Sequence, residues 1–343
     1  MAENTDLGAA DRKKDHINLA FKSRVTADML DARFYYEPMV SLHEADPSSI
    51  AMHFLGKTFS TPIWVSSMTG GTSAAATINK NLAKACGEFG MGMGLGSCRQ
   101  LLFSDDYLAD FQVRKYMGSQ PLYANLGIAQ LETLADLHQW DKIDTLLDKL
   151  EADGLIVHVN PLQEWLQPEG DRFKYAPLDT IKRLLDKAGY KIIVKEVGQG
   201  MGPESLRALL ELPIEAVDFG ASGGTNFALL ELFRSSQAIT ENYQKLAHVG
   251  HSAEEMVTFV NDIFLGQPNK MVCNQVIISG GIADFLDGYF LMQKLKVPSI
   301  YGQASGLLKH AQQSYELLQQ HLDLQIKGLI LAKAFLKVKQ DGI

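Results

Sequence analysis

Short apolar runs alternate with longer amphipathic segments along the chain from residue 61 onward. Each run is bounded by glycine or polar residues, as expected for a strand buried on both faces of a parallel sheet. The runs that predict strands are residues 62–67, 91–97, 122–127, 155–160, 191–197, 216–220, 275–279 and 299–302. Strands of this kind joined by helices predict an α/β protein, a closed (β/α)8 TIM barrel whose functional groups gather on the loops after the strands.

The segments between these runs carry apolar residues at helical spacing. We expect helices over residues 73–89, 131–151, 178–187, 204–212 and 285–295, and closing helices within residues 307–337. Residues 227–271 show no strand pattern, which predicts a helical insertion after strand 6. A doubly wound open sheet is the alternative fold, but it would normally carry an early GxGxxG turn. The glycines of residues 91–96 instead alternate, which we interpret as a strand whose small residues let a flat ligand approach the backbone. A tightly packed barrel layer is the alternative.

The first 60 residues precede this repeating pattern. They predict an N-terminal helical arm with one or two helices that pack on the barrel. We therefore expect a single domain made of residues 1–60 and a barrel of residues 61–343. Arg12, Lys13 and His16 stand at the start of the arm, before the apolar residues of its first helix. They suit either a solvated helix start or a cationic flap over a phosphate.

Length, composition and charge exclude several classes of protein. At 343 residues and 46% hydrophobic the chain can bury a large core, and no apolar run approaches the roughly 18 residues that span a bilayer. We expect a soluble, cytoplasmic protein without a membrane partner. The formal net charge of −8 argues against nucleic-acid binding. Cys86, Cys98 and Cys273 are too widely spaced for a disulfide framework or a structural zinc site.

Polar residues concentrate where the fourth predicted strand ends. An apolar run is followed by His158, Asn160, Gln163 and Glu164, and Pro161 stops the strand between them. An imidazole can move a proton, amides can hold a ligand, and a carboxylate is the hard oxygen donor that Mg2+ prefers. A polar strand end that caps the next helix is the alternative interpretation.

The other strand ends carry groups suited to a phosphate and an aromatic cofactor. Glycine-rich turns at residues 223–225 and 280–281 offer backbone N–H groups to a phosphate. Lys195 ends the fifth strand, where a fixed cation would suit the electron-rich edge of a flavin. An ion pair with Glu196 is the alternative, but adjacent strand residues face opposite ways. His248 and His251 have a spacing that could suit a metal, and we interpret them as surface histidines.

These motifs, in this order, resemble the type 2 isopentenyl-diphosphate isomerases, a family of FMN-dependent barrels. The resemblance covers nearly the whole chain and rests on residues 12–16, 68–71, 96–99, 125, 158–164, 194–198, 223–225 and 279–281. It implies a reversible 1,3-allylic shift between isopentenyl and dimethylallyl diphosphate, with reduced FMN, Mg2+, and NADPH as the flavin reductant. It also implies a homo-oligomer, a tetramer or an octamer. The chain departs from the family pattern at Gly220, often serine there, at Phe227, often tryptophan, and at residues 302–305.

The resemblance also implies a role for each residue of the predicted site. His158 and Gln163 are implied to lie at the hydrocarbon end of the substrate as catalytic residues, with Gln163 orienting it. Glu164 is implied to bind Mg2+. Residues implied to bind the diphosphate substrate are Arg12, Lys13, His16, Ser97, Arg99, Asn160 and Gln163. Residues implied to bind FMN are Ser67, Met68, Thr69, Gly70, Ser97, Asn125, Lys195, Thr225, Gly280, Gly281, Ala304 and Ser305.

Two other functions fit a barrel of this kind. A flavin-dependent 2-hydroxy-acid oxidase would need a histidine base and paired arginines on the late loops, and the sequence shows no such pair. A non-catalytic nucleotide-binding barrel would lack the polar group between His158 and Glu164. Purified protein that is not yellow and does not bind FMN would exclude both flavin enzymes.

Overall fold

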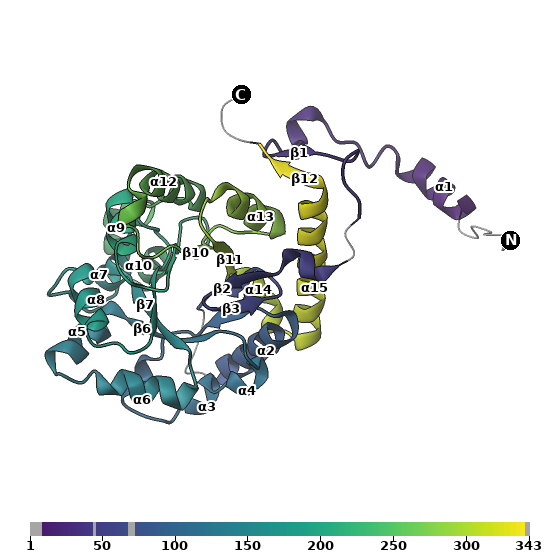
Figure 1. Cartoon of the computed structure of the whole chain (residues 1–343). Helices are drawn as coiled ribbons and strands as arrows, with labels where there is room; N and C mark the ends of the chain where they lie inside the picture. Colours follow the sequence, from purple (N-terminus) through teal and green to yellow (C-terminus); the bar gives the residue numbers. More distant parts are fainter. Residues whose placement is uncertain (1–8, 44–45, 68–72, 340–343) are drawn as a thin grey trace.

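Eight parallel strands close into a barrel in the computed structural model, which describes residues 9–43, 46–67 and 73–339 (Figure 1). Neighbouring strands pair in chain order, and β11 pairs with β4 to close the ring. The strands are β4 (Ile63–Val65), β5 (Gly92–Gly94), β6 (Leu122–Gly127), β7 (Gly154–Val159), β8 (Lys191–Glu196), β9 (Ala216–Asp218), β10 (Val276–Ser279) and β11 (Ser299–Gln303). Each overlaps a predicted apolar run, so the predicted barrel is confirmed.

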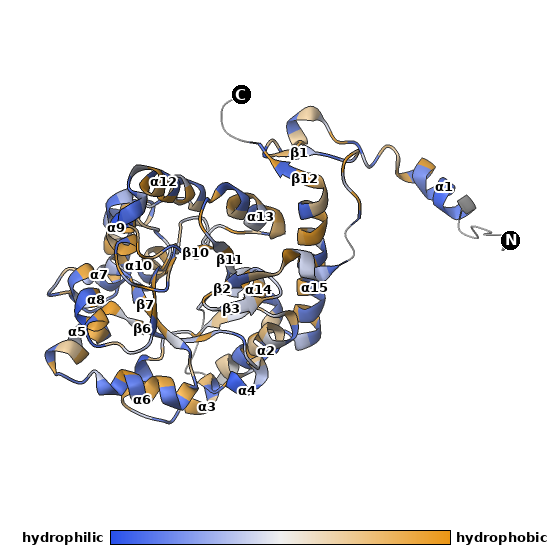
Figure 2. Ribbon diagram, in the orientation of Figure 1, coloured by the Kyte–Doolittle hydropathy of each residue, from blue (hydrophilic) through white to orange (hydrophobic). Residues whose placement is uncertain are grey.

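Helices surround the barrel and connect its strands. They are α2 (Ser73–Phe89), α3 (Leu108–Phe111), α4 (Arg114–Met117), α5 (Ile128–Asp136), α6 (Asp141–Leu150), α7 (Pro161–Leu166), α8 (Pro177–Leu185), α9 (Pro203–Leu210), α10 (Phe227–Arg234), α11 (Gln237–Ala247), α12 (Ala253–Gly266), α13 (Phe285–Lys294), α14 (Ser305–Ala311) and α15 (Tyr315–Phe335). The predicted insertion is confirmed, because α10, α11 and α12 stand between β9 and β10. Figure 2 shows hydrophobic and hydrophilic residues alternating along α15, as expected for a helix with one buried face. Within the described ranges, no helix has the length and apolar character needed to cross a bilayer.

Two predicted helices differ from the structure. Residues 131–151 form the separate helices α5 and α6, because His138 adopts a left-handed φ of 54° between them. The helix predicted to reach residue 337 ends at Phe335, and Leu336–Val338 form strand β12. β12 pairs antiparallel with β1 (Phe34–Tyr36), which lies in a region where the sequence predicts only helices. Pairing between the two ends of the chain thus overrides the local helical spacing.

The interior of the barrel is apolar from its amino-terminal end to its centre. The inward residues at this level are Trp64, Tyr123, Ile156, Ile193, Ala216, Ile277 and Ile300. A hairpin of β2 (Met52–Phe54) and β3 (Lys57–Phe59) covers the amino-terminal opening, and its Phe54 and Phe59 join the same cluster. A Cβ on Gly92 would lie 2.5 Å from the Trp64 ring. Gly92 therefore makes room for the indole, and the tightly packed layer is the correct interpretation at this position.

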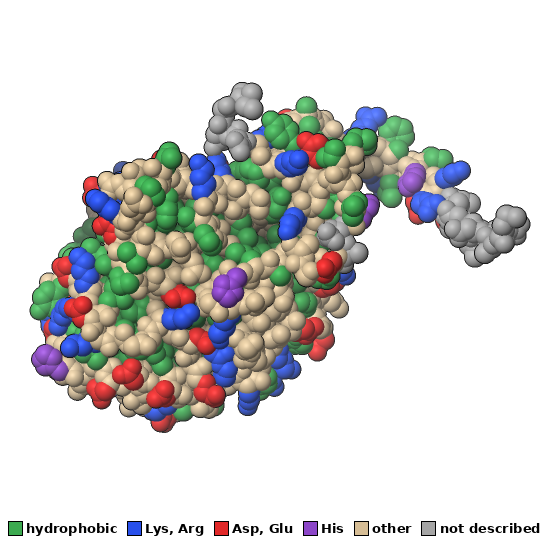
Figure 3. All heavy atoms as spheres, viewed as in Figure 1, with side chains coloured by type: hydrophobic (Ala, Val, Ile, Leu, Met, Phe, Trp, Pro, Cys, Tyr) green, Lys and Arg blue, Asp and Glu red, His purple; other side chains and the backbone are tan. Residues whose placement is uncertain are grey.

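The N-terminal arm, residues 9–33, lies outside the barrel. It contains α1 (Ala9–Leu19) and a short 3-10 helix at Ala27–Met29. Figure 1 shows α1 standing apart beyond α15, and Figure 3 shows hydrophobic and charged side chains exposed along the arm. The end of the arm is anchored where Arg33 donates to Asp287 at 2.7 Å and the Phe34 ring contacts Tyr289 and Phe290.

Candidate functional site

A layer of polar side chains covers the apolar interior at the carboxyl ends of the strands. It lies two residues beyond the apolar layer on each strand, since alternate strand residues share a face. Its members are Ser66, Asn125, His158, Lys195, Asp218 and Ser279, with Gly94 and Gly302 on β5 and β11. A Cβ on Gly302 would lie 2.6 Å from the Ser66 hydroxyl oxygen. The layer therefore forms the floor of a site, and this floor is lowest near β11, where a glycine takes the place of a side chain. A flat ligand can lie on this floor.

A cavity opens above this floor, among the loops that follow β4, β8, β9, β10 and β11. Its lining includes Ser67, Lys195, Thr225, Gly280, Gly281, Ala304 and Ser305, all of them predicted FMN ligands. Ser97 and Asn125 are not part of this lining, and Met68, Thr69 and Gly70 lie outside the described residues. The buried hydroxyls of Ser66 and Ser67 have no hydrogen-bond partner among the described residues. Both can bond a ligand that enters the cavity.

Glycines shape the late loops of the cavity. Gly280 and Gly281 have φ values of 92° and 72°, and Gly223 has a φ of 113°. A Cβ on Gly280 would lie 2.0 Å from the carbonyl oxygen of Ala221. Only glycine fits this backbone, which brings the loops after β9 and β10 together. Turns of this kind present backbone N–H groups that suit a phosphate.

Lys195 supplies the buried cation of the cavity. Its Nζ donates to the backbone carbonyl of Glu196 at 2.6 Å, and the residue is 8% exposed. The Glu196 carboxylate faces the other way and accepts from the backbone N–H groups of Gly198, Gln199 and Gly200. The prediction that Lys195 and Glu196 do not share a face is confirmed.

Asp218 is a buried acid that was not among the residues predicted for the site. It lies opposite Lys195 in the register of β8 and β9 and is fully buried. Its Oδ1 accepts from the Ser279 hydroxyl, and its Oδ2 has no hydrogen-bond partner among the described residues. Burial raises the pKa of Asp218, whereas Lys195 and the bond from Ser279 act to lower it. The alternation of Ala216 and Asp218 on the sixth strand is the signal that could have placed this carboxylate inside the barrel.

The tautomer of His158 is set by its hydrogen bonds. Asn125 Nδ2 donates to the Leu95 carbonyl at 3.1 Å, which turns Asn125 Oδ1 toward His158 Nδ1 at 2.7 Å. An amide oxygen only accepts, so Nδ1 carries the proton and Nε2 keeps its lone pair. Burial, and then the charge of Lys195, lower the pKa of His158 to about 4. At neutral pH His158 therefore presents an uncharged acceptor at the floor of the site.

Asn160, Gln163 and Glu164 form one hydrogen-bonded group at the start of α7. Asn160 Nδ2 donates to Gln163 Oε1 at 3.1 Å and to Glu164 Oε1 at 3.0 Å, and Glu164 Oε2 accepts from the Asp171 N–H at 2.7 Å. Asn160 is the N-cap residue of α7, but its side chain bonds Gln163 and Glu164 and makes no capping bond to the helix backbone. Within the described ranges no three His, Cys, Asp or Glu side chains form a metal cluster. A cation at Glu164 would need oxygens from substrate or water, as Mg2+ usually does.

The residues predicted to bind the diphosphate lie in two separate places. Arg99 lies beside the Glu164 group, because its guanidinium bonds Asp171 at 3.3 Å, and Ser97 accepts from the Arg99 N–H. Arg12, Lys13 and His16 are exposed on α1, outside the barrel. A single chain therefore brings Ser97 and Arg99 to the site and leaves the cations of the arm away from it.

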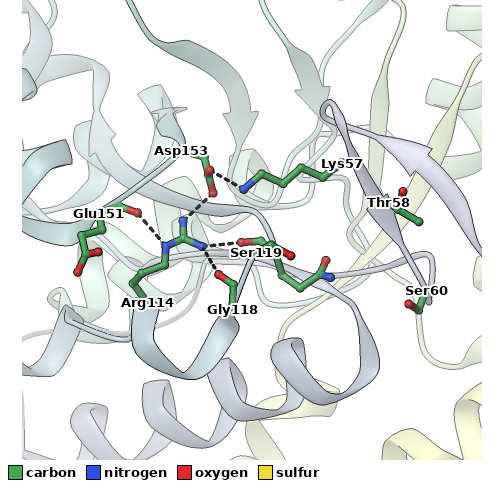
Figure 4. Close-up of a pocket in the computed structure, with 9 residues that line it drawn as sticks. Lys57, Thr58, Ser60, Arg114, Gly118, Ser119, Glu151 and Asp153 are labelled. Carbon is green, nitrogen blue, oxygen red and sulfur yellow. Dashed lines mark hydrogen bonds and ion pairs between the residues drawn. The ribbon is translucent and has the colours of Figure 1, made fainter.

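A second depression lies at the amino-terminal end of the barrel (Figure 4). Both of its inner cations are held by one acid, since Lys57 bonds Asp153 at 2.5 Å and Arg114 bonds it at 2.6 Å. The Arg114 guanidinium also donates to the backbone carbonyls of Glu151, Gly118 and Gln120. This network joins the loops before β6 and β7, and we interpret it as structural.

Comparison with known proteins identifies the family of this chain. No family model matches the chain. An isopentenyl-diphosphate delta-isomerase of Rickettsia felis is 32% identical over 336 residues, which cover 96% of this chain and 93% of the relative. The chain belongs to the isopentenyl-diphosphate delta-isomerase family. Its relative from Picrophilus torridus, which bears the same name, is 34% identical over 335 residues, covering 93% and 89% of the two chains. Membership of this family makes the protein an enzyme.

Solved structures agree with the barrel fold. A mandelate oxidase variant with (S)-mandelic acid has a TM-score of 0.57 at 11% identity, covering 91% of this chain and 88% of the oxidase. A flavocytochrome b2 variant with sulfite bound has a TM-score of 0.58 at 14% identity, covering 88% and 72%. At these identities the likeness concerns the fold alone.

The structure gives a physical account of one departure from the family pattern. Gly220 has a φ of 52°, and a Cβ there would lie 1.9 Å from the carbonyl oxygen of Glu196. This backbone has no room for the serine that the family often carries. Phe227, in place of the frequent tryptophan, is part of the cavity lining.

Proposed function

We propose that this enzyme interconverts isopentenyl and dimethylallyl diphosphate by a 1,3-allylic proton shift that uses reduced FMN and Mg2+. The proposal rests on two groups of residues that lie next to the same polar layer at the carboxyl ends of the strands. One is the glycine-lined cavity with buried Lys195, and the other is the group of His158, Asn160, Gln163 and Glu164. The family relationship supplies the choice of reaction.

The residues of the cavity fit FMN. The turns at Gly223 and Gly280–Gly281 offer N–H groups to its phosphate, and the Ser66 and Ser67 hydroxyls lack protein partners among the described residues. Lys195 provides a fixed positive charge in a buried setting, which would stabilise a reduced, anionic ring. When bound, reduced FMN would supply an electron-rich ring surface and a nitrogen that can carry a proton.

The other group fits the substrate. An unactivated alkene has no acidic C–H, so the proton transfers require a site that excludes water. His158 is neutral and keeps a free acceptor at Nε2, so it can orient or hold a proton beside the hydrocarbon. Gln163 is held by Asn160 and can only orient, because an amide does not titrate near neutral pH. Glu164 would hold Mg2+ against the diphosphate, and Ser97 and Arg99 would bind its oxygens.

A component-omission assay tests the reaction. Isopentenyl diphosphate is supplied with enzyme, FMN, NADPH and Mg2+, and each component is left out in turn. Because the isomerisation moves no net electrons, anaerobic photoreduced enzyme should make dimethylallyl diphosphate for many turnovers without further reductant and should incorporate solvent deuterium. NADPH consumed in proportion to product, or full activity with oxidised FMN, would refute the mechanism.

Glu164→Gln tests the metal role. An amide oxygen is a much weaker ligand for a hard dication. The variant should retain FMN and lose turnover, or need far more Mg2+ for half-maximal rate. Glu169→Gln, an exposed acid five residues away that pairs with Arg234 instead, is the matched control. Equal Mg2+ dependence in the two variants would remove Glu164 as the metal ligand.

The arm is tested by Arg12→Ala and Lys13→Ala. Charge-assisted bonds to phosphate contribute about 1.5–3 kcal/mol each, so each variant should raise the KM for the diphosphate by about tenfold or more while FMN affinity stays the same. Normal kinetics in both would show that the arm only packs. We also propose that the protein is a cytoplasmic homo-oligomer with NADPH as its flavin reductant.

A further inference from the structure

Helix α7 carries Gln163 and Glu164 of the proposed substrate site, and it has only six residues. Isolated helices shorter than about 12 residues are marginally stable in water, and the last carbonyls of a helix lack partners within it. The direction of the Glu164 carboxylate therefore depends on what holds α7 from outside. That support comes from residues 167–176, which join α7 to α8 and which we name the α7–α8 loop.

Arg172 fastens this loop to the C-terminal end of α7. Its Nη1 donates to the Glu164 carbonyl at 2.6 Å, and its Nη2 donates to the Trp165 carbonyl at 3.2 Å. Nη1 also lies 3.1 Å from the Gly170 carbonyl oxygen and 3.3 Å from that of Asp171, and the guanidinium lies 4.6 Å from the centre of the Trp165 ring. Its hydrogen bonds to described residues all go to backbone carbonyls. The planar group of Arg172 thus holds the backbone of α7 and of the loop together.

Gly170 lets the loop come this close to α7. A Cβ on Gly170 would lie 2.0 Å from the Glu164 carbonyl oxygen and 3.0 Å from that of Gln167. A side chain at this position would therefore push the loop away from the carbonyl that Arg172 binds.

A buried acid holds the far end of the loop. Glu132 on α5 is 6% exposed, and its carboxylate accepts from the backbone N–H groups of Lys174 at 2.9 Å and Tyr175 at 3.4 Å. The loop is thus fixed on both sides of Asp171.

The fixed loop places Asp171 between Glu164 and Arg99. The backbone N–H of Asp171 donates to Glu164 Oε2 at 2.7 Å, while Asn160 donates to Glu164 Oε1 at 3.0 Å. One donor on each oxygen fixes the plane of the carboxylate and leaves its other lone pairs for a cation. The Asp171 carboxylate accepts from the Arg99 guanidinium at 3.3 Å and from Gln130 Nε2 at 3.4 Å.

We propose that Arg172 and Asp171 are positioning residues for the reaction. Arg172 clamps the α7–α8 loop on α7, and Asp171 then orients the Glu164 carboxylate for Mg2+ and the Arg99 guanidinium for the diphosphate. This rests on the proposed function, in which Glu164 and Arg99 contact the metal and the substrate. Groups that orient metal ligands typically contribute about 10–100-fold to metal affinity or activity.

Two substitutions of Arg172 test the clamp. Arg172→Ala should raise the Mg2+ concentration for half-maximal rate by about 10–100-fold. It should leave FMN affinity unchanged, because the described lining of the cavity includes no residue of the loop. Arg172→Lys should show nearly the same defect, since an ammonium keeps the charge and lacks the planar fork. A wild-type Mg2+ requirement in Arg172→Ala, or full rescue by lysine, would overturn the clamp.

Metal binding without turnover gives a second measurement of the same effect. Free Mn2+ is counted by electron paramagnetic resonance in protein that holds oxidised FMN and inorganic pyrophosphate. Arg172→Ala should weaken Mn2+ binding by about 10–100-fold, and amide hydrogen exchange in residues 167–176 should become faster. Faster exchange with wild-type Mn2+ affinity would overturn the positioning role. Weakened Mn2+ binding in a protein whose wild type shows no isomerisation would support the clamp and refute the proposed reaction.

Gly170→Ala displaces the loop by another route, because its Cβ would meet the Glu164 carbonyl oxygen. It should raise the Mg2+ requirement as Arg172→Ala does. Glu169→Gln is the matched control in the same loop, since Glu169 is exposed and pairs with Arg234 at 2.6 Å. An equal Mg2+ requirement in Gly170→Ala and Glu169→Gln would contradict the role of the loop.

Asp171→Asn tests the link to Arg99. The variant keeps the backbone N–H that bonds Glu164 and removes the charge that holds the Arg99 guanidinium. The KM for isopentenyl diphosphate should rise by about two- to fivefold, as for loss of an exposed ion pair, with an unchanged Mg2+ requirement. In the Arg99→Ala background the same substitution should change KM no further. An unchanged KM in the single variant, or a further rise in the double variant, would overturn this link.

Discussion

Replacement of Gly220 offers a sharp test of the geometry of the proposed flavin cavity. The residue has a φ of 52°, and a Cβ there would meet the Glu196 carbonyl oxygen at 1.9 Å and its carbon at 2.2 Å. That carbonyl ends β8 and accepts the Lys195 Nζ at 2.6 Å, so it cannot move without disturbing the buried cation. A left-handed non-glycine residue costs roughly 1–2 kcal/mol, and overpacking adds about 1–3 kcal/mol. Gly220→Ala should therefore lower the free energy of unfolding by about 2–5 kcal/mol.

Two other glycines separate these contributions. Gly118 has a φ of 57° and a ψ of −128°, which non-glycine residues rarely adopt, and nothing lies near its added Cβ, so Gly118→Ala carries only the backbone cost of about 1–3 kcal/mol. Gly189 is exposed, lacks a left-handed φ and has open space, so Gly189→Ala should change stability by no more than about 0.5 kcal/mol. Urea unfolding followed by circular dichroism gives the three values. FMN affinity should fall in Gly220→Ala alone. Equal losses in Gly220→Ala and Gly118→Ala would refute the steric argument.

Two further predictions concern the titratable groups of the floor. The pKa of His158 is lowered to about 4 by burial and Lys195, whereas the unfolded side chain titrates near 6.5. The free energy of unfolding should thus be highest above about pH 6.5 and fall as the pH approaches 4. His158→Gln should flatten that part of the plot of urea midpoint against pH. An unchanged plot would contradict the lowered pKa of His158. Asp218→Asn keeps an acceptor for Ser279 and removes the negative charge opposite Lys195, so the reduction potential of bound FMN should become more positive. Spectroelectrochemical titration measures it, and a potential equal to or below that of wild type would show that Asp218 does not balance Lys195.

The barrel could be predicted because each of its strands is buried on both faces and therefore appears as an apolar run. The break between α5 and α6 could not, since one non-glycine residue with a left-handed φ, His138, leaves the helical spacing of its neighbours unchanged. The pairing of β1 with β12 was also missed. Its partners lie at opposite ends of the chain, and no local pattern records such a contact.

In the site, too, residues marked by a local sequence pattern could be predicted, and those that depend on contacts between strands could not. His158 and Glu164 were predicted because they follow one apolar run, and Lys195 because it ends the next. Asp218 acquires its meaning only from the register that places it opposite Lys195, which depends on two strands at once. Gly92 was interpreted as a possible ligand approach, but the residue that needs its space is Trp64, on the neighbouring strand.

The β1–β12 ribbon also orders events during synthesis of the protein. Phe34 pairs with Val338, so the anchor of the arm forms only after residue 338 has been synthesised. Until then the arm lacks the fixed base that the ribbon provides, although it is synthesised before the barrel. A chain truncated before residue 336 would keep the eight strands of the barrel and lose the strand that anchors the arm.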